Sequence, residues 1–231
     1  ISEGQIFIRT TGHLLAVTNS IAPEVAVAEG SSSTPFPTEL ATDQVLPFDD
    51  FEDGDLFAHT GVRWQTFTNG VSGAALQLVG NGAAATAQAA RLDGKLTLGA
   101  ARGPLAQMYQ PFDRGAVPIN LGNLGGIRFY ARGNNPFELT LRCGDGEVGK
   151  ELDTSEEWQL IELGADELIP ISGSPQVVDW RSGAGGWNGN GCIGLYFSRR
   201  SAANIGEFWF EVDEITFYGA DAWELRDDSP R

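Results

Sequence analysis

The sequence predicts an all-β protein: a two-sheet antiparallel β-sandwich of the jelly-roll type, with an extended N-terminal arm. Short runs rich in aromatic and β-branched residues follow one another along most of the chain, and Gly, Asn, Asp or Pro stands in nearly every gap between them. Helical periodicity is almost absent. The 30 Gly and 11 Pro among 231 residues supply the turns that many short strands require.

Residues 1–48 differ from the rest of the chain. The run GQIFIRTTGHLLAVTN has strand character, but the stretch that follows, EGSSSTPFPTELATDQ, has the composition of a linker. Roughly 20 ordered residues are too few to bury a core of their own. We therefore interpret this segment as an arm laid across the main body or as the end of a preceding, attached domain. Because the chain begins with Ile1 and not with Met, we expect that its start has been processed.

Residues 49–219 are predicted to form the jelly-roll binding domain, and residues 220–231 a polar C-terminal tail. Three runs alternate most clearly: 127–133, 137–143 and 192–198. Each has one apolar face and one face of Arg, Tyr and small polar residues, a pattern typical of a sandwich whose outer face touches a ligand. We expect these polar side chains to share one surface, with Trp187 of the glycine-rich loop RSGAGGWNGNG beside them. The candidate ligand-binding residues are thus Arg128, Tyr130, Arg132, Thr140, Arg142, Trp187 and Tyr196.

A structural role competes with binding at several of these positions. Arg128 and Arg142 have acidic neighbours with which to pair across strands, Glu138 and Glu162. Trp187 is equally compatible with a ligand platform and with a lid packed over an edge.

Other aromatic and cysteine positions are also assigned from the alternation. Trp64 and Trp158 are predicted to plug the sandwich interior. Cys143 falls on the apolar face of its strand and Cys192 on the polar face of its own, so two free thiols are predicted unless a bulge brings them together.

The last strand changes phase. Phe208, Phe210 and Val212 alternate regularly, but the next apolar residues are Ile215 and Phe217. A β-bulge at residues 213–214 is therefore predicted.

Charge and missing motifs exclude several classes of function. The net charge of −16 disfavours nucleic acid and anionic membranes, because both need surplus Lys and Arg. No apolar run approaches the ~18 residues of a membrane span, so no membrane insertion is expected. The chain has only two His and lacks GxSxG, HExxH and phosphate-loop motifs. We therefore expect no catalytic activity.

Five motifs in order carry a resemblance to known proteins: FDDFEDGD, TGVRW, GGIRFYARG, EWQLIEL and FWFEVDEITFYG. Over residues 47–219 the chain resembles the galactose-binding-like jelly rolls of the complex-I intermediate-associated protein family, and it is similar to the related family-11 carbohydrate-binding modules. The resemblance implies a domain without a catalytic centre of its own.

The resemblance also implies a structural calcium ion between the first and last strands. The matching positions are Glu52 and Asp213, and calcium favours such carboxylate oxygens. The alternative is that Asp49, Asp50, Asp53 and Asp55 form a solvated acidic turn.

From these observations we expect a carbohydrate-binding module that uses an Arg- and Tyr-rich outer face. The alternative is a protein-interaction or assembly domain of the complex-I intermediate-associated type. The partner is accordingly a glycan or a protein, and the expected location is extracellular or periplasmic.

Overall fold

The computed structural model describes residues 5–10, 13–18, 45–99, 103–112, 121, 124–143, 146–171, 192–200 and 205–219. The chain divides into two compact units, Ile1–Glu39 and Leu40–Arg231. In the first unit, β1 (Gln5–Thr10) and β2 (His13–Thr18) form an antiparallel hairpin. Within the described residues, no helix is long and apolar enough to cross a membrane.

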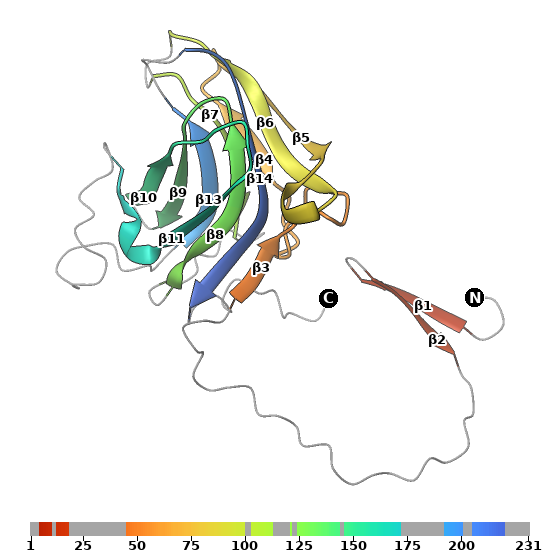
Figure 1. Cartoon of the computed structure of the whole chain (residues 1–231). Helices are drawn as coiled ribbons and strands as arrows, with labels where there is room; N and C mark the ends of the chain where they lie inside the picture. The colour runs from red at the N-terminus through yellow and green to blue at the C-terminus, as the bar shows by residue number, and fades with distance from the viewer. Residues whose placement is uncertain are drawn as a thin grey trace. The chain divides into compact units, whose positions relative to one another are not determined.

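The second unit is a sandwich of two antiparallel sheets, which Figure 1 shows as two layers. The first layer, here called the β14 sheet, has the order β11 (Gln159–Gly164), β8 (Leu124–Gly133), β14 (Gly206–Gly219), β6 (Gln88–Leu96) and β5 (Gly73–Gly80), with β3 (Val45–Asp49) also paired to β14. The second layer, the β13 sheet, has the order β12 (Ile169–Pro170), β10 (Gly146–Leu152), β9 (Phe137–Cys143), β13 (Cys192–Arg199), β7 (Ala106–Pro111) and β4 (Gln65–Thr68). The predicted all-β, two-sheet architecture is confirmed.

Short turns complete the described part of this unit. Two single-turn 3-10 helices interrupt the strands, η1 (Ala83–Ala85) and η2 (Ala165–Glu167). Residues 45–48, which the sequence places in the N-terminal arm, lie in β3, and β3 pairs with the second half of β14.

The core lies between the apolar faces of the two sheets. Phe197 of β13 packs edge-on against Phe129 of β8, with ring centroids 5.2 Å apart, so the two layers meet through these rings. Trp64 is 2% exposed and lies among the same side chains, as its predicted role in the interior requires.

Cys143 and Cys192 form a disulfide, so the prediction of two free thiols is wrong. The two residues are directly opposite each other in β9 and β13. The register shifts between Cys192 and Gly194, and this bulge brings Cys192 beside Cys143. Simple alternation along β13 had placed the two cysteines on opposite faces.

The predicted bulge in β14 is confirmed. The register with β8 shifts between Asp213 and Thr216, and Glu214 has φ = 51°. On its other side, β14 pairs with β6 through Val212 and with β3 from Ile215 onward. Asp213 therefore lies at the gap where one neighbouring strand ends and the next begins.

Candidate ligand-binding faces

The sequence-predicted binding residues lie on two different sheets. Thr140, Arg142 and Tyr196 belong to the β13 sheet, through β9 and β13. Residues 128–132 lie in β8, which pairs with β11 and β14 instead.

The prediction of one shared surface is therefore wrong. Arg128, Tyr130 and Arg132 are on the outer face of the β14 sheet, on the far side of the sandwich from Arg142 and Tyr196. Alternation correctly separates core from outer side chains within a strand, but it carries no information about which sheet the strand joins. Trp187 lies outside the described residues.

A row of register-paired positions crosses the outer face of the β13 sheet. Its members are register partners on successive strands: Gln65, Tyr109, Tyr196, Thr140, Gly149 and Ile169. Because directly opposed side chains on one face of a sheet are neighbours, the side chains from Gln65 to Thr140 adjoin one another; Gly149 contributes none.

An aromatic stack occupies the centre of this row. The rings of Tyr109 and Tyr196 lie 5.3 Å apart between centroids and only 9° from parallel. The Arg142 guanidinium lies 4.9 Å from the centroid of the Tyr196 ring. Since β13 lies between β7 and β9, Tyr109 and Arg142 reach Tyr196 from opposite sides. Tyr196 is consequently only 8% exposed, whereas Tyr109 is half-buried.

The sequence reasoning missed Tyr109 and Gln65. The Tyr109 hydroxyl donates a hydrogen bond to Gln65 Oε1 at 2.7 Å, which orients the ring at the end of the stack. A signal for Tyr109 was present: in the run LAQMYQPF it alternates with Met108, which is fully buried. Nothing in the sequence indicates that Gln65 lies opposite it.

Charged groups flank the stack on the β13 face. Arg142 Nε donates to Glu147 Oε1 at 3.0 Å, so its partner is Glu147 rather than Glu138 or Glu162. Arg200 lies 3.6 Å from Glu147 and 3.8 Å from Glu138. Burial raises the pKa of the Glu138 carboxyl and also the pKa of the Tyr196 hydroxyl. Tyr196 therefore keeps its proton at neutral pH and is a hydrogen-bond donor.

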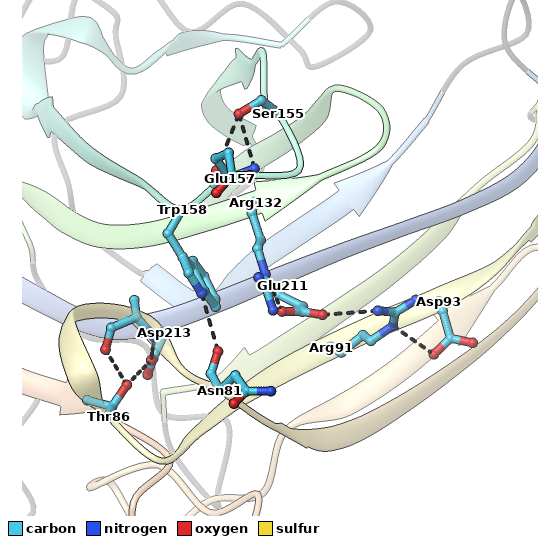
Figure 2. Close-up of polar contacts among 11 residues, drawn as sticks. Asn81, Thr86, Arg91, Asp93, Arg132, Ser155, Glu157, Trp158, Glu211 and Asp213 are labelled. Carbon is cyan, nitrogen blue, oxygen red and sulfur yellow. Dashed lines mark hydrogen bonds and ion pairs between the residues drawn. The ribbon is translucent and has the colours of Figure 1, made fainter.

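The outer face of the β14 sheet carries a second group of planar side chains (Figure 2). Arg132 Nε and Arg91 Nη1 both donate to Glu211, at 2.6 and 3.0 Å. The Arg132 guanidinium lies 4.6 Å from the centroid of the Trp158 ring, and that of Arg91 lies 4.7 Å from the Trp209 ring.

Trp158 does not plug the core as predicted. It is half-buried on the outer face of the β14 sheet. Side chains alternate between the two faces of a strand, and Ile161 and Leu163 of β11 face inward. Trp158 and Leu160, at the alternate positions, therefore face outward, and Leu160 is 53% exposed.

Glu52 and Asp213, the two residues expected to bind calcium, both contact one turn. Glu52 Oε1 accepts hydrogen bonds from the backbone N–H groups of Ala87 and Gln88, both at 2.8 Å. Asp213 Oδ2 accepts from Ala83 N at 2.7 Å and from Thr86 Oγ1 at 2.6 Å. Two carboxylates far apart in sequence are thus held by the same short segment.

Several oxygen atoms lie close together at this turn. A Cβ added to Gly82 would overlap Thr86 Oγ1, Gln88 O and Asp213 Oδ2, so three oxygens of different origin converge there. Burial raises the pKa of Asp213, against the hydrogen bonds from Thr86, Ala83 and Glu214, and the charge of Glu52 adds a smaller increase. Among the described residues, no group of three or more His, Cys, Asp and Glu side chains could hold a metal ion, so hydroxyl and carbonyl oxygens would have to complete a calcium site here.

The fold is that of carbohydrate-binding-module jelly rolls. The chain is similar to the family 11 carbohydrate-binding module of the cellulosomal cellulase Lic26A-Cel5E of Clostridium thermocellum, with a TM-score of 0.53 and 17% identity over 78% of this chain and 97% of that one. It is also similar to the family 11 module from Clostridium thermocellum in complex with a β-1,3-1,4-mixed-linked tetrasaccharide, with a TM-score of 0.54 and 16% identity over 78% of this chain and 98% of that one. No family model and no curated protein matches the sequence. The comparisons lend no support to the resemblance to the complex-I intermediate-associated family.

Proposed function

We propose that this chain is a non-catalytic carbohydrate-binding module that holds a glycan on the outer face of the β13 sheet. The stack of Arg142, Tyr196 and Tyr109 is the observation that carries the proposal. Sugars present apolar C–H faces and hydroxyl edges, and aromatic rings beside planar donors complement both.

Each member of the face has a distinct part. Tyr109 is the less buried of the two rings and offers the stacking surface, while the exposed Gln65 in the same row offers hydrogen-bonding groups. Arg142 holds Tyr196 in place and retains donors for hydroxyls, since its side chain is still 41% exposed. The row follows the direction across the strands, which suits an extended oligosaccharide.

The structural neighbours indicate which glycan to test first. One of them is described with a β-1,3-1,4-mixed-linked tetrasaccharide bound, and we propose glucans of this linkage as the first ligand class for this chain. The Cys143–Cys192 disulfide supports an oxidising location, extracellular or periplasmic, where such polysaccharides occur.

The experiment is affinity electrophoresis and calorimetry with mixed-linkage β-glucan, cellulose, xylan and galactomannan. Tyr109→Ala should weaken binding at this face at least tenfold, about 1.4 kcal/mol, because the stacking ring is lost. Tyr109→Phe is the matched control, since it keeps the ring and removes only the bond to Gln65. If a properly folded Tyr109→Ala variant bound with undiminished affinity, the β13 face would not be the binding site.

We also propose that a structural calcium ion is held at the turn that joins Glu52 to Asp213. Thr86 and the carbonyl of Gln88 would add neutral oxygens, as the convergence beside Gly82 suggests. Bound there, the ion would offset the negative charge of the two carboxylates and fasten the bulge of β14 to the β5–β6 turn.

A further inference from the structure

The outer face of the β14 sheet carries a row of alternating planar and charged side chains, here called the Trp–Arg row. Arg91, Glu211 and Arg132 are register partners on β6, β14 and β8. The guanidinium of Arg91 lies over the Trp209 ring. That of Arg132 lies over the Trp158 ring, and Figure 2 shows this second pair. This row lies on the opposite side of the sandwich from the Tyr109–Tyr196 stack.

The side chains of the Trp–Arg row are held in place by their neighbours. Glu211 is only 3% exposed, although it lies on an outer face, and it binds both arginines. The indole N–H of Trp158 donates to Asn81 O at 3.3 Å. A binding surface whose rings and donors are already ordered loses less conformational entropy when a ligand arrives.

The charge of the Trp–Arg row favours a neutral ligand. Arg91 and Arg132 contribute two positive charges, and Glu211 together with Asp93, 3.7 Å from Arg91, contributes two negative ones. An anionic ligand would therefore find no net attraction at this row.

Two indole rings are the most effective partners for the C–H face of a sugar. The side chains of Arg91 and Arg132 are 29% and 24% exposed, and each guanidinium has more N–H donors than its pairing with Glu211 uses. Vicinal hydroxyls match such paired donors in spacing.

We propose that the Trp–Arg row is a second binding surface for a neutral glycan, separate from the β13 face. Trp158 and Trp209 provide the rings, and Arg91 and Arg132 bind the hydroxyls. The inference extends the proposed function, because both faces then bind the same class of ligand. A module with one glycan site on each side of its sandwich links two polysaccharide chains, which a module with a single site does not do.

The test is the stoichiometry and cross-linking of mixed-linkage β-glucan, with xylan and galactomannan as further neutral probes and alginate as an anionic one. We expect two tetrasaccharides per chain in calorimetry. Tyr109→Ala should bind only at the Trp–Arg row, Trp209→Ala only at the β13 face, and the double variant at neither. Only the wild type should raise the viscosity of a soluble β-glucan solution.

Two further variants keep the test valid if an alanine variant fails to fold. Trp158→Phe retains a ring and a cation–π contact, and we expect at least fivefold weaker binding at this face. Arg132→Lys keeps the ion pair with Glu211 but loses the planar donor pair, and we expect a similar loss.

The outcomes separate the two proposals. The inference is overturned if there is a single site that is lost in Tyr109→Ala and unchanged in Trp209→Ala, Trp158→Phe and Arg132→Lys. That result would still support the β13 face. A single site with the reverse pattern supports the Trp–Arg row and overturns the β13 face. Binding of none of the neutral glycans overturns both, and binding of alginate alone overturns the neutral class proposed here.

Discussion

Asp49 is a carboxyl buried in the sandwich, 2% exposed. Trp64 Nε1 donates a hydrogen bond to its Oδ2 at 2.6 Å, and Phe51 N donates to its Oδ1 at 2.9 Å. Burial nevertheless raises the pKa of Asp49 from 3.8 to about 8, and nearby Asp53 and Asp50 add to the effect. The loss of hydration of the carboxylate therefore raises the pKa more than the two hydrogen bonds lower it.

The raised pKa of Asp49 makes stability depend on pH. The unfolded chain releases the proton near pH 4, whereas the folded chain keeps it until about pH 8. The stabilisation linked to this proton is therefore complete below pH 4 and is lost as the pH rises to 8. We expect the free energy of unfolding to fall by a few kcal/mol over that interval, as measured by urea denaturation. Asp49→Asn should flatten this slope and the exposed Asp153→Asn should not. If the free energy of unfolding of Asp49→Asn still fell with pH as in the wild type, a group other than Asp49 would be responsible.

The calcium proposal makes a prediction at Glu52. Calcium should raise the Tm of the wild type by several degrees and a chelator should reverse the change, because an ion that binds only the folded state stabilises it. Glu52→Gln keeps an oxygen for the amides of Ala87 and Gln88 but removes the charge, so it should abolish most of the calcium response. Asp153→Asn should respond like the wild type. A wild-type Tm that is indifferent to calcium and to chelator, in metal-free protein, would refute the site.

Among the strands, β9 and β13 are joined both by their register and by the Cys143–Cys192 disulfide. The bulge beside Cys192 lets this residue pair with Cys143, while Tyr196 pairs with Thr140 in the regular part of β13. The register of β13 with β9 is therefore shared by the disulfide and by the stack of Tyr196 and Arg142.

The disulfide closes a loop with a sequence separation of 49 residues. Replacing both cysteines by alanine should reduce the free energy of unfolding by about 2–4 kcal/mol, since the unfolded chain regains the entropy that the cross-link removes. Chemical denaturation with and without reductant measures this effect. Reductant should destabilise the wild type and have no effect on the double variant. Detection of two free thiols in the unfolded, unreduced protein would contradict the pairing.

In the whole molecule, the two compact units differ in what stabilises them. The described hydrophobic core draws its residues from positions 48–217, all within Leu40–Arg231. The unit Ile1–Glu39 contains a two-stranded hairpin, a structure that is marginal by itself.

A chain truncated to residues 40–231 should therefore keep its stability. We expect its Tm to lie within about 3 °C of that of the full chain, because no residue of the described core is removed. Calorimetry of the two proteins side by side provides the comparison, and affinity for β-glucan should also be retained. A drop of 10 °C or more would show that the N-terminal segment contributes to the fold.

Much of the architecture follows from local sequence. Because side chains in a strand alternate with period two, the runs 127–133 and 137–143 reveal their core and outer faces without any knowledge of their partners. The phase change at residues 213–214 reveals the bulge of β14 for the same reason. The sequence by itself therefore determined the all-β class, the inward and outward sides of the strands and the position of that irregularity.

Only the tertiary structure decided which strands share a sheet. Arg142 and Arg128 look alike in sequence, yet they lie on opposite sides of the sandwich, because strand pairing joins residues far apart along the chain. Pairing likewise stacks Tyr109 on Tyr196 and, through a bulge that local alternation does not reveal, brings Cys192 to Cys143. A period-two pattern gives the direction of a side chain, whereas its neighbours across the sheet depend on register and strand order, which only long-range packing determines.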